Sequence, residues 1–500
     1  MKKTEVIETK SGKIHGYCEN GLEIFKGITY AEPPVGDLRL RPPVAKEPWN
    51  DVFSATQYGP CSFQGYSQLE EWFGKPQPES EDCLNLNIWT PATDNKKRPV
   101  MFWIHGGAFT IGTGKDPMYD GSSLAKKDVV VVTINYRLGI LGYLHIPGET
   151  VNVGQFDQIL ALKWVHDNIE LFGGDPDNVT IFGESAGGYA VVTLSAMPAA
   201  KGLFHRVIAQ SAPFINPEVN NRVTKGIMRQ MSLKKDDIEG LRKIPPEKII
   251  EAQNKYFEKN PTDILALRPL IDGDTIPNHP LKAFRNGECS HIDFMIGTNE
   301  DEFKLFSALD PNLANINGDA AENMLIGYLG GMGIDTKRGK EIFSTYKEAR
   351  SEGNYSTEPK ELASALITDS IFRISTIRLL EAQKVHQPNT YNYMFTFKST
   401  AFDGSLGACH ALELPFVFGT YNLPLMDGFV GKNPNKELSE KMMDAWISFA
   451  RTGNPNHEAI PEWPAYDVDK RATMLFGNEC KLANTVFDKE RAAWDGLFEI

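Results

Sequence analysis

One serine in the chain lies in a pattern that can make it a nucleophile. Ser185 is flanked by Gly183 and Gly187 in the stretch GESAG, which follows the β-rich run NVTIF and precedes the helix-like stretch YAVVTLSAM. Glycines on both sides allow a tight, strained turn that lifts the serine Oγ above a sheet edge. The same letters also fit an ordinary glycine-rich turn. A reactive serine therefore requires a base, an acid and an oxyanion site elsewhere in the chain.

A second loop, WIHGGAF at 103–109, directly follows an apolar run and fits an oxyanion site. Backbone N–H groups of such a loop stabilise the charge that develops on an ester carbonyl oxygen. We expect Gly106 to form the turn and Phe109 to contact substrate. The alternative is a plain β-turn at a strand end. The expected N–H donors belong to small residues of this loop and of the first turn after the serine: Gly107, Ala108 and Ala186.

Three acidic residues follow a later strand-like run, DFMIGT, and are candidates for the acid that orients the base. They are Glu300, Asp301 and Glu302. In hydrolases with a serine elbow the chain order is serine, then acid, then histidine. One of the three should therefore hold the base, and the other two fit a charge run on the surface.

The base has to be a histidine that follows the acid, which leaves His386, His410 and His457. His386 ends a polar helix tail, and His457 lies in a loop rich in Gly, Asn and Pro. His410 lies in the glycine-rich loop GSLGACHALELPFVFG, after the strand-like run TYNYMFTF. An imidazole in that position can reach over a sheet edge, which favours His410 as the general base.

The elements around these residues predict an α/β fold with a large, mostly parallel sheet. The runs PVMFWIH at 99–105 and DVVVVTINY at 128–136 are apolar on both faces, as central parallel strands covered by helices are. Strands that alternate with helix-patterned stretches, such as 155–172, indicate the same architecture.

Two further features complete the predicted organisation. The first thirty residues alternate between apolar and polar, with turns at Ser11-Gly12 and Asn20-Gly21, which predicts a small antiparallel meander. Two long helix-rich stretches, at about 212–290 and 303–388, interrupt the later strands. We expect these insertions to form caps over the site.

The composition excludes several classes of function. The 500 residues are 41% hydrophobic and carry a net charge of −13, so the chain lacks the basic surface that nucleic acids and anionic membranes attract. No stretch approaches 18 consecutive apolar residues, and no Cys/His cluster has metal spacing, so we expect no membrane span, metal or cofactor. The start, MKKTEVIETK, lacks an apolar segment, so we expect no signal peptide and a cytoplasmic location. The choice between monomer and dimer stays open.

Together these motifs resemble the type-B carboxylesterase family of α/β-hydrolases, which includes the cholinesterases, and most of all its bacterial para-nitrobenzyl esterase branch. The matching text runs almost from end to end: FKGITYAEPPVGDLRL, SEDCLNLNIWTP, WIHGGAF, NYRLGILGYL, NVGQFDQILALKWVHDNIELFGGDPDNVTIFGESAGG, GTNEDEF and HALELPFVFG. The resemblance implies an α/β-hydrolase fold in a single catalytic domain over residues 1–500, with the two insertions as caps.

The resemblance also implies which residues act. The family's acid closes the pattern that is GTNEDE here, which is Glu302, and its base precedes the ELPFVFG run, which is His410. With Ser185 they form the implied triad, and Ser211 corresponds to a serine beside the acid. Glu184 is expected to point away from the chemistry.

Other family features concern the framework and the pocket. The resemblance implies two structural ion pairs, Arg39 with Glu81 and Arg137 with Asp157. Secreted relatives pair the cysteines that correspond to Cys61 and Cys83, and whether they pair here stays open. The nearby Trp72 is a candidate for lining the pocket.

The expected activity is hydrolysis of small or medium neutral esters, small-molecule substrates, through an acyl-enzyme. Lipase-like, amidase or carbamate hydrolysis on the same site are alternatives. A non-catalytic binding domain is a further alternative, which the presence of Ser185, Glu302 and His410 disfavours.

Overall fold

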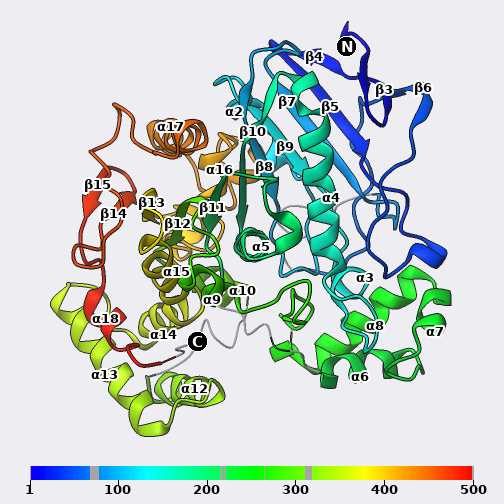
Figure 1. The fold of residues 1–500 in the computed structure, drawn as a ribbon. Coiled ribbons are helices and arrows are strands. Elements are labelled where there is room, and N and C mark those ends of the chain that lie inside the picture. The colour runs from blue at the N-terminus through cyan, green and yellow to red at the C-terminus, as the bar shows by residue number, and fades with distance from the viewer. Residues whose placement is uncertain are drawn as a thin grey trace.

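A single large sheet organises the molecule (Figure 1). The structure is a computed structural model that describes residues 2–67, 78–213, 218, 221–263, 265–309 and 318–497. The sheet has 12 strands in the order β1-β4-β5-β7-β9-β8-β10-β11-β12-β13-β14-β15. Its strands are β1 (Lys2–Lys3), β4 (Tyr17–Glu19), β5 (Leu22–Thr29), β7 (Asn85–Thr90), β9 (Val130–Ile134), β8 (Arg98–Ile104), β10 (Gly174–Glu184), β11 (Arg206–Gln210), β12 (Asp293–Asn299), β13 (Thr390–Phe395), β14 (Thr473–Phe476) and β15 (Cys480–Ala483).

The centre of the sheet is parallel and its margins are antiparallel. Every neighbouring pair from β9 to β14 is parallel, whereas the pairs outside this run are antiparallel. The strands β8 and β9, which the apolar runs predict, lie in the parallel centre and are almost wholly buried. The predicted α/β fold with a large, mostly parallel sheet is therefore confirmed for the centre.

The prediction of one N-terminal meander is corrected, because these strands divide between two sheets. The strands β2 (Ile7–Thr9), β3 (Gly12–His15) and β6 (Trp49–Ser54) form a separate three-stranded sheet, whereas β4 and β5 join the large one. Gly16 lies at the crossing, where a Cβ atom would meet the Ile24 carbonyl oxygen at 2.2 Å. This close approach lets the chain pass from one sheet to the other.

Helices cover both faces of the sheet. Successive residues of β8 alternate between two hydrophobic cores, with Phe102 in one and Trp103 in the other, as the pleat requires. The first face carries α4 (Val153–Asn168), α5 (Ala186–Ser195), α9 (Pro280–Arg285) and α15 (Ile374–Lys384), and the second carries α2 (Ser122–Ala125), α16 (Leu414–Val417) and α17 (Lys436–Thr452).

The two predicted insertions supply helices that lie beyond the end of the sheet at which β10 meets α5 (Figure 1). Two helices are exceptions and belong to the layer that covers the first face. Helix α9 falls within 212–290 but packs on α5 and α15, and α15 falls within 303–388 but packs on β12 and β13. The remaining helices of the insertions are α6 (Asn221–Gln230), α7 (Ile238–Lys243), α8 (Pro246–Lys259), α10 (Phe303–Leu309), α12 (Gly318–Gly331), α13 (Thr336–Glu352) and α14 (Pro359–Thr368).

Both predicted ion pairs are confirmed. The Arg137 guanidinium donates from Nη2 to Asp157 Oδ1 at 2.6 Å and from Nε to Oδ2 at 2.8 Å, with both side chains buried. Arg39 binds both carboxylate oxygens of Glu81. The thiols of the six cysteines are all free, those of Cys61 and Cys83 included. No helix within the described ranges is long and apolar enough to cross a membrane.

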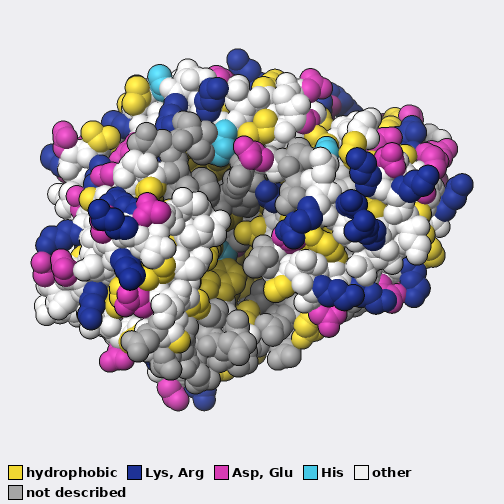
Figure 2. Space-filling view, turned by 90° about the horizontal axis from the view of Figure 1, so that it is seen from below, with side chains coloured by type: hydrophobic (Ala, Val, Ile, Leu, Met, Phe, Trp, Pro, Cys, Tyr) yellow, Lys and Arg dark blue, Asp and Glu magenta, His cyan; other side chains and the backbone are white. Residues whose placement is uncertain are grey.

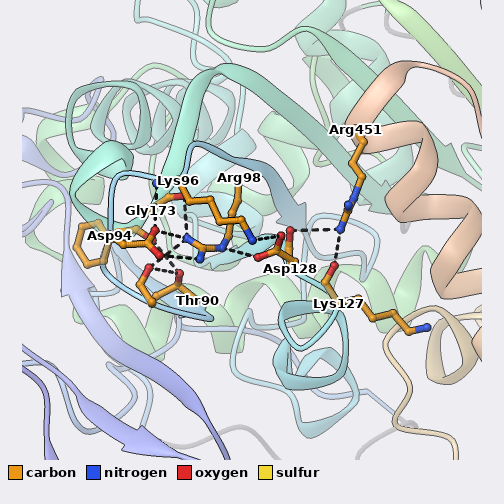
Figure 3. A network of polar contacts seen from close by, with 10 residues as sticks. Thr90, Asp94, Lys96, Arg98, Lys127, Asp128, Gly173 and Arg451 are labelled. Atoms are coloured by element: carbon orange, nitrogen blue, oxygen red, sulfur yellow. Dashed lines mark hydrogen bonds and ion pairs between the residues drawn. The ribbon is translucent and has the colours of Figure 1, made fainter.

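A polar network ties together the amino ends of the central strands (Figure 3). At the start of β8, Arg98 donates to both carboxylate oxygens of Asp94, at 2.5 and 2.9 Å, and from Nε to Asp128 at 2.8 Å. Arg451, at the end of α17, donates to the carbonyl of Lys127. The network thus links the loops before β8 and β9 with the end of α17, at the end of the sheet opposite Ser185.

Because the network lies far from Ser185, disrupting it should lower the stability of the fold and leave the Ser185 turn unchanged. Arg98→Met should lower the free energy of unfolding by about 1–3 kcal/mol, since the half-exposed carboxylates of Asp94 and Asp128 lose their cation and the Gly173 carbonyl loses a donor. Urea denaturation measures this loss. Hydrogen–deuterium exchange at the Ser185 turn should stay unchanged, because the turn lies at the other end of β10. Unchanged stability, or faster exchange confined to that turn, would contradict this account of the network.

Candidate active site

Ser185 stands on a strained turn between β10 and α5. Its backbone has φ 57° and ψ −121°, a conformation that non-glycine residues rarely adopt. The turn is held because the Ser185 N–H donates to the Gln210 carbonyl at 2.9 Å. Gly187 is required for packing, since a Cβ atom there would lie 2.1 Å from the Ile104 carbonyl oxygen. Strain held by close packing is a frequent feature of functional sites.

The loop after β8 lies directly against this turn. A Cβ atom on Gly106 would lie 2.7 Å from the Glu184 carbonyl oxygen and 3.1 Å from Ser185 Cβ, so glycine is what allows the approach. The next residues, Gly107 and Ala108, have positive φ angles of 107° and 52°. Within the described part of the chain, the N–H groups of Gly107, Ala108 and Ala186 donate no hydrogen bond. Three donors without a protein acceptor thus lie on the two segments that flank the serine.

One candidate substrate contact in this loop is corrected, and another lies outside the described residues. Phe109 has no exposed surface, and its ring packs 4.8 Å from the ring of Tyr143, centroid to centroid. Its positive φ of 59° turns the side chain into the core, so it belongs to the packing under the loop. Trp72 lies outside the described residues.

His410 and Glu302 form a short, buried hydrogen bond. His410 Nδ1 lies 2.6 Å from Glu302 Oε2, and the two side chains are almost fully buried. The other carboxylate oxygen, Oε1, accepts from Ser211 Oγ at 2.6 Å and from the Asn299 N–H at 2.7 Å. These donors satisfy the carboxylate, so its charge can be buried and directed at the imidazole.

The two other acidic candidates point elsewhere. Glu300 pairs with Lys398 at 2.8 Å. Asp301 pairs with Lys304, and its Oδ2 accepts from the Ala408 N–H at 2.9 Å. Asp301 therefore holds the loop that carries the histidine, and neither side chain contacts the imidazole.

The expectation that Glu184 points away from the site is wrong. Its Oε1 lies 3.0 Å from His410 Nε2, although it has no aligned hydrogen bond with any described residue. Among these residues Ser185 Oγ makes no hydrogen bond with the imidazole either. Side chains alternate along β10, so Glu184 shares a face with Phe182, which packs in the core that also holds Cys409 and Leu412 beside the histidine. This alternation was the signal that sequence reasoning missed.

The two carboxylates beside His410 favour a charged imidazole. Burial alone lowers the pKa of His410, but the carboxylates of Glu184 and Glu302 outweigh burial and raise it well above its usual value. Burial in turn raises the pKa of the Glu184 carboxyl. The site is therefore suited to stabilising an imidazolium next to the serine.

A third carboxyl group, Glu413, was also missed. Burial and the nearby charges of Glu184 and Glu302 raise its pKa to about 8. Its oxygens accept from Gln210 Nε2 at 2.9 Å and from Asn299 Nδ2 at 2.7 Å. Its position three residues after His410, in the turn that leads into α16, was the available signal. A protonated Glu413 spares the site a further negative charge at neutral pH.

Aromatic rings enclose the imidazole. The ring centroids of Phe372 and Phe306 lie 4.8 and 5.2 Å from that of His410. Phe372 is buried, whereas Phe306 is 38% exposed. Seen from below, the molecule is hollowed between two lobes, with hydrophobic side chains along the floor of the hollow (Figure 2). Within the described ranges no group of three or more His, Cys, Asp and Glu residues could hold a metal ion.

Comparison with known proteins agrees with this geometry. The model of the carboxylesterase family matches residues 3–494. The chain belongs to the carboxylesterase family. It is 37% identical to the para-nitrobenzyl esterase of Bacillus subtilis, over 97% of this chain and 98% of the relative. It is 36% identical to the phenmedipham hydrolase of Pseudarthrobacter oxydans, over 95% of each.

Solved structures of carboxylesterases also resemble this chain. A carboxylesterase of Geobacillus stearothermophilus superimposes with a TM-score of 0.85 at 36% identity, covering 98% of this chain and 100% of that one. The predicted family, the α/β-hydrolase fold and the assignment as a carboxylesterase are therefore confirmed.

The contact between Glu184 and His410 predicts a pH effect in this carboxylesterase. A base must be neutral to accept a proton, and the Glu184 carboxylate favours the charged imidazole. Glu184→Gln removes that charge, so the pKa of His410 should fall. The acidic limb of the pH profile of kcat/KM should then move to lower pH, because that limb reports the free enzyme. An acidic limb that stays in place or moves to higher pH would show that Glu184 does not act on the imidazole.

Proposed function

We propose that this carboxylesterase hydrolyses small or medium neutral esters through a triad of Ser185, His410 and Glu302. The observation that supports this most directly is the 2.6 Å hydrogen bond from His410 Nδ1 to Glu302 Oε2, next to the strained serine turn. The partners of Glu302 leave it as an acceptor, so the imidazole carries its proton on Nδ1. Nε2 is then free to act as the base.

In the proposed mechanism, Ser185 Oγ attacks the ester carbonyl carbon while His410 Nε2 takes the hydroxyl proton. The imidazole exchanges its contact with Glu184 for one with Ser185 Oγ, a tightening that is common when substrate binds. The oxyanion is held by the unpaired N–H groups of Gly107, Ala108 and Ala186.

The second half of the proposed cycle reverses the proton transfer. The imidazolium protonates the departing alcohol and leaves an acyl group on Ser185. Water then attacks the acyl carbon, with His410 again as the base, and releases the acid. Glu302 stabilises the imidazolium that forms in each half through its hydrogen bond with Nδ1, and the nearby charge of Glu184 adds to this effect.

The surroundings of the imidazole support the proposed substrate class. The partly exposed ring of Phe306 favours an apolar group beside the scissile bond, since aromatic surface binds apolar groups without desolvating a charge. One relative is named a para-nitrobenzyl esterase, which fits a neutral aromatic ester.

The triad predicts unequal effects for two neighbouring glutamates. Glu302→Gln should lower kcat for a short-chain p-nitrophenyl ester by roughly 10³–10⁴-fold, because an amide in place of the acid stabilises the wrong tautomer. Glu300→Gln is the matched control and should stay within about twofold of wild type, since Glu300 pairs with the half-exposed Lys398 and not with the imidazole. Steady-state kinetics measure both. A large loss in Glu300→Gln with an active Glu302→Gln would move the acid to Glu300.

A further inference from the structure

A single π-helical turn interrupts the long helix that passes beneath the imidazole. The turn η6 (Asp369–Arg373) lies between α14 and α15, and the N–H of Ile374 donates to the Asp369 carbonyl, five residues earlier. Such turns insert one extra residue and re-aim the side chains within them, and they are frequent at functional sites. Here the re-aimed residue is Phe372, which packs on His410.

One side of this helix contacts all the segments that hold the imidazole. The Phe372 ring lies 4.8 Å from that of His410, centroid to centroid. Thr368 Oγ1 accepts from the N–H of Phe303, the residue after Glu302, at 3.1 Å. Ser375 Oγ donates at 3.2 Å to the carbonyl of Ala212, the residue after Ser211. The turn contacts the base through Phe372, and the helical residues on either side of it contact the segments that carry the acid and Ser211.

The other side of the turn is anchored by a buried ion pair. Arg373 Nε donates to Asp369 Oδ1 at 2.6 Å, and both side chains are at most 8% exposed. Tyr346 in α13 donates its hydroxyl to Asp369 Oδ2. The hydroxyl oxygen accepts from Trp494 Nε1 at 2.7 Å.

The C-terminal part of the chain completes the anchor. Arg373 Nη1 donates to the Val486 carbonyl at 3.2 Å, and the guanidinium lies over the ring of Phe487 at 5.5 Å. A segment more than 70 residues after the base is thus fastened to the turn that supports the base. Removing one partner of such a buried pair would leave an uncompensated charge, so any rearrangement of the turn that separates Arg373 from Asp369 is costly.

We propose that the turn 369–373 is a positioning element for the proposed triad, with Phe372 as its positioning residue and Arg373, fixed by residues 486–494, as its anchor. This inference rests on the proposed function. Phe372 covers one face of the imidazole, keeps the ring aligned with Glu302 and excludes water from their hydrogen bond. The C-terminal segment acts on catalysis only through this turn.

The test compares wild type, Phe372→Leu and the double variant Asp369→Asn/Arg373→Met. The double variant removes both charges, so neither remains buried without its partner. Arg206→Met/Asp293→Asn is the matched control. This pair lies at the amino ends of β11 and β12, with Nε 3.1 Å from Oδ2, and its guanidinium also donates to the carbonyl of a distant segment, at Ala450.

If the turn positions the imidazole, the variants of the turn should lose kcat with little change in KM. For a short-chain p-nitrophenyl ester, kcat of Phe372→Leu and of the double variant should fall by roughly ten- to a hundredfold, the effect of a small misplacement of a catalytic group. Adding Phe372→Leu to the double variant should cause little further loss, because both act through one contact. The control variant should lower Tm and leave kcat unchanged.

A spectroscopic measurement separates positioning from stability. The His410 Nδ1 proton gives a downfield NMR signal when it is held by a carboxylate, and its exchange with water should be faster in both turn variants and unchanged in the control. Turn variants that fold and keep the kcat and the proton exchange of the control would overturn the proposal. If the double variant does not fold, the kcat and the proton exchange of Phe372→Leu alone test the proposal.

A separate variant, Glu302→Gln, shows whether the triad assignment itself is wrong. The downfield signal should disappear in Glu302→Gln if Glu302 holds the imidazole. A signal that survives in Glu302→Gln counts against the proposed triad. A signal that is lost there but is unaffected by the turn variants counts against the positioning role alone.

Discussion

The buried hydrogen bond between His410 and Glu302 constrains the rest of the site. A carboxylate without exposure is stable only when donors satisfy it, and here Ser211 Oγ, the Asn299 N–H and the imidazole do so. These donors come from the ends of β11 and β12 and from the loop after β13, which are neighbours because the strands are parallel. The parallel centre of the sheet is therefore what brings residues 211, 302 and 410 to one point.

The same sheet holds the strain of the nucleophile's turn. Ser185 adopts an unfavourable backbone conformation. The conformation persists because β10 lies between β8 and β11, and the glycines around Ser185 pack against carbonyl groups of those two strands. The loop after β8 approaches the turn only because Gly106 lacks a side chain. Backbone packing, rather than side-chain contacts, thus aligns the serine with the N–H groups around it.

The sequence predicted what depends on local pattern and missed what depends on side-chain direction. Continuous apolar runs identified β8 and β9, and glycine spacing identified the turn at Ser185. Phe109 was misplaced because its positive φ, which turns the ring into the core, cannot be read from its neighbours. Glu184 was misjudged because its distance from His410 depends on a loop more than 200 residues later. The π turn at 369–373 has no local signature, since its helix continues on both sides.

The central claim is that Ser185 carries the acyl group, and covalent labelling tests it most directly. An organophosphonate ester reacts with a serine that has an aligned base and oxyanion site, and peptide mapping by mass spectrometry identifies the labelled residue. We expect one label for each chain, located on Ser185, with loss of esterase activity in proportion to labelling. A label on another residue, or full activity in a chain labelled at Ser185, would contradict it.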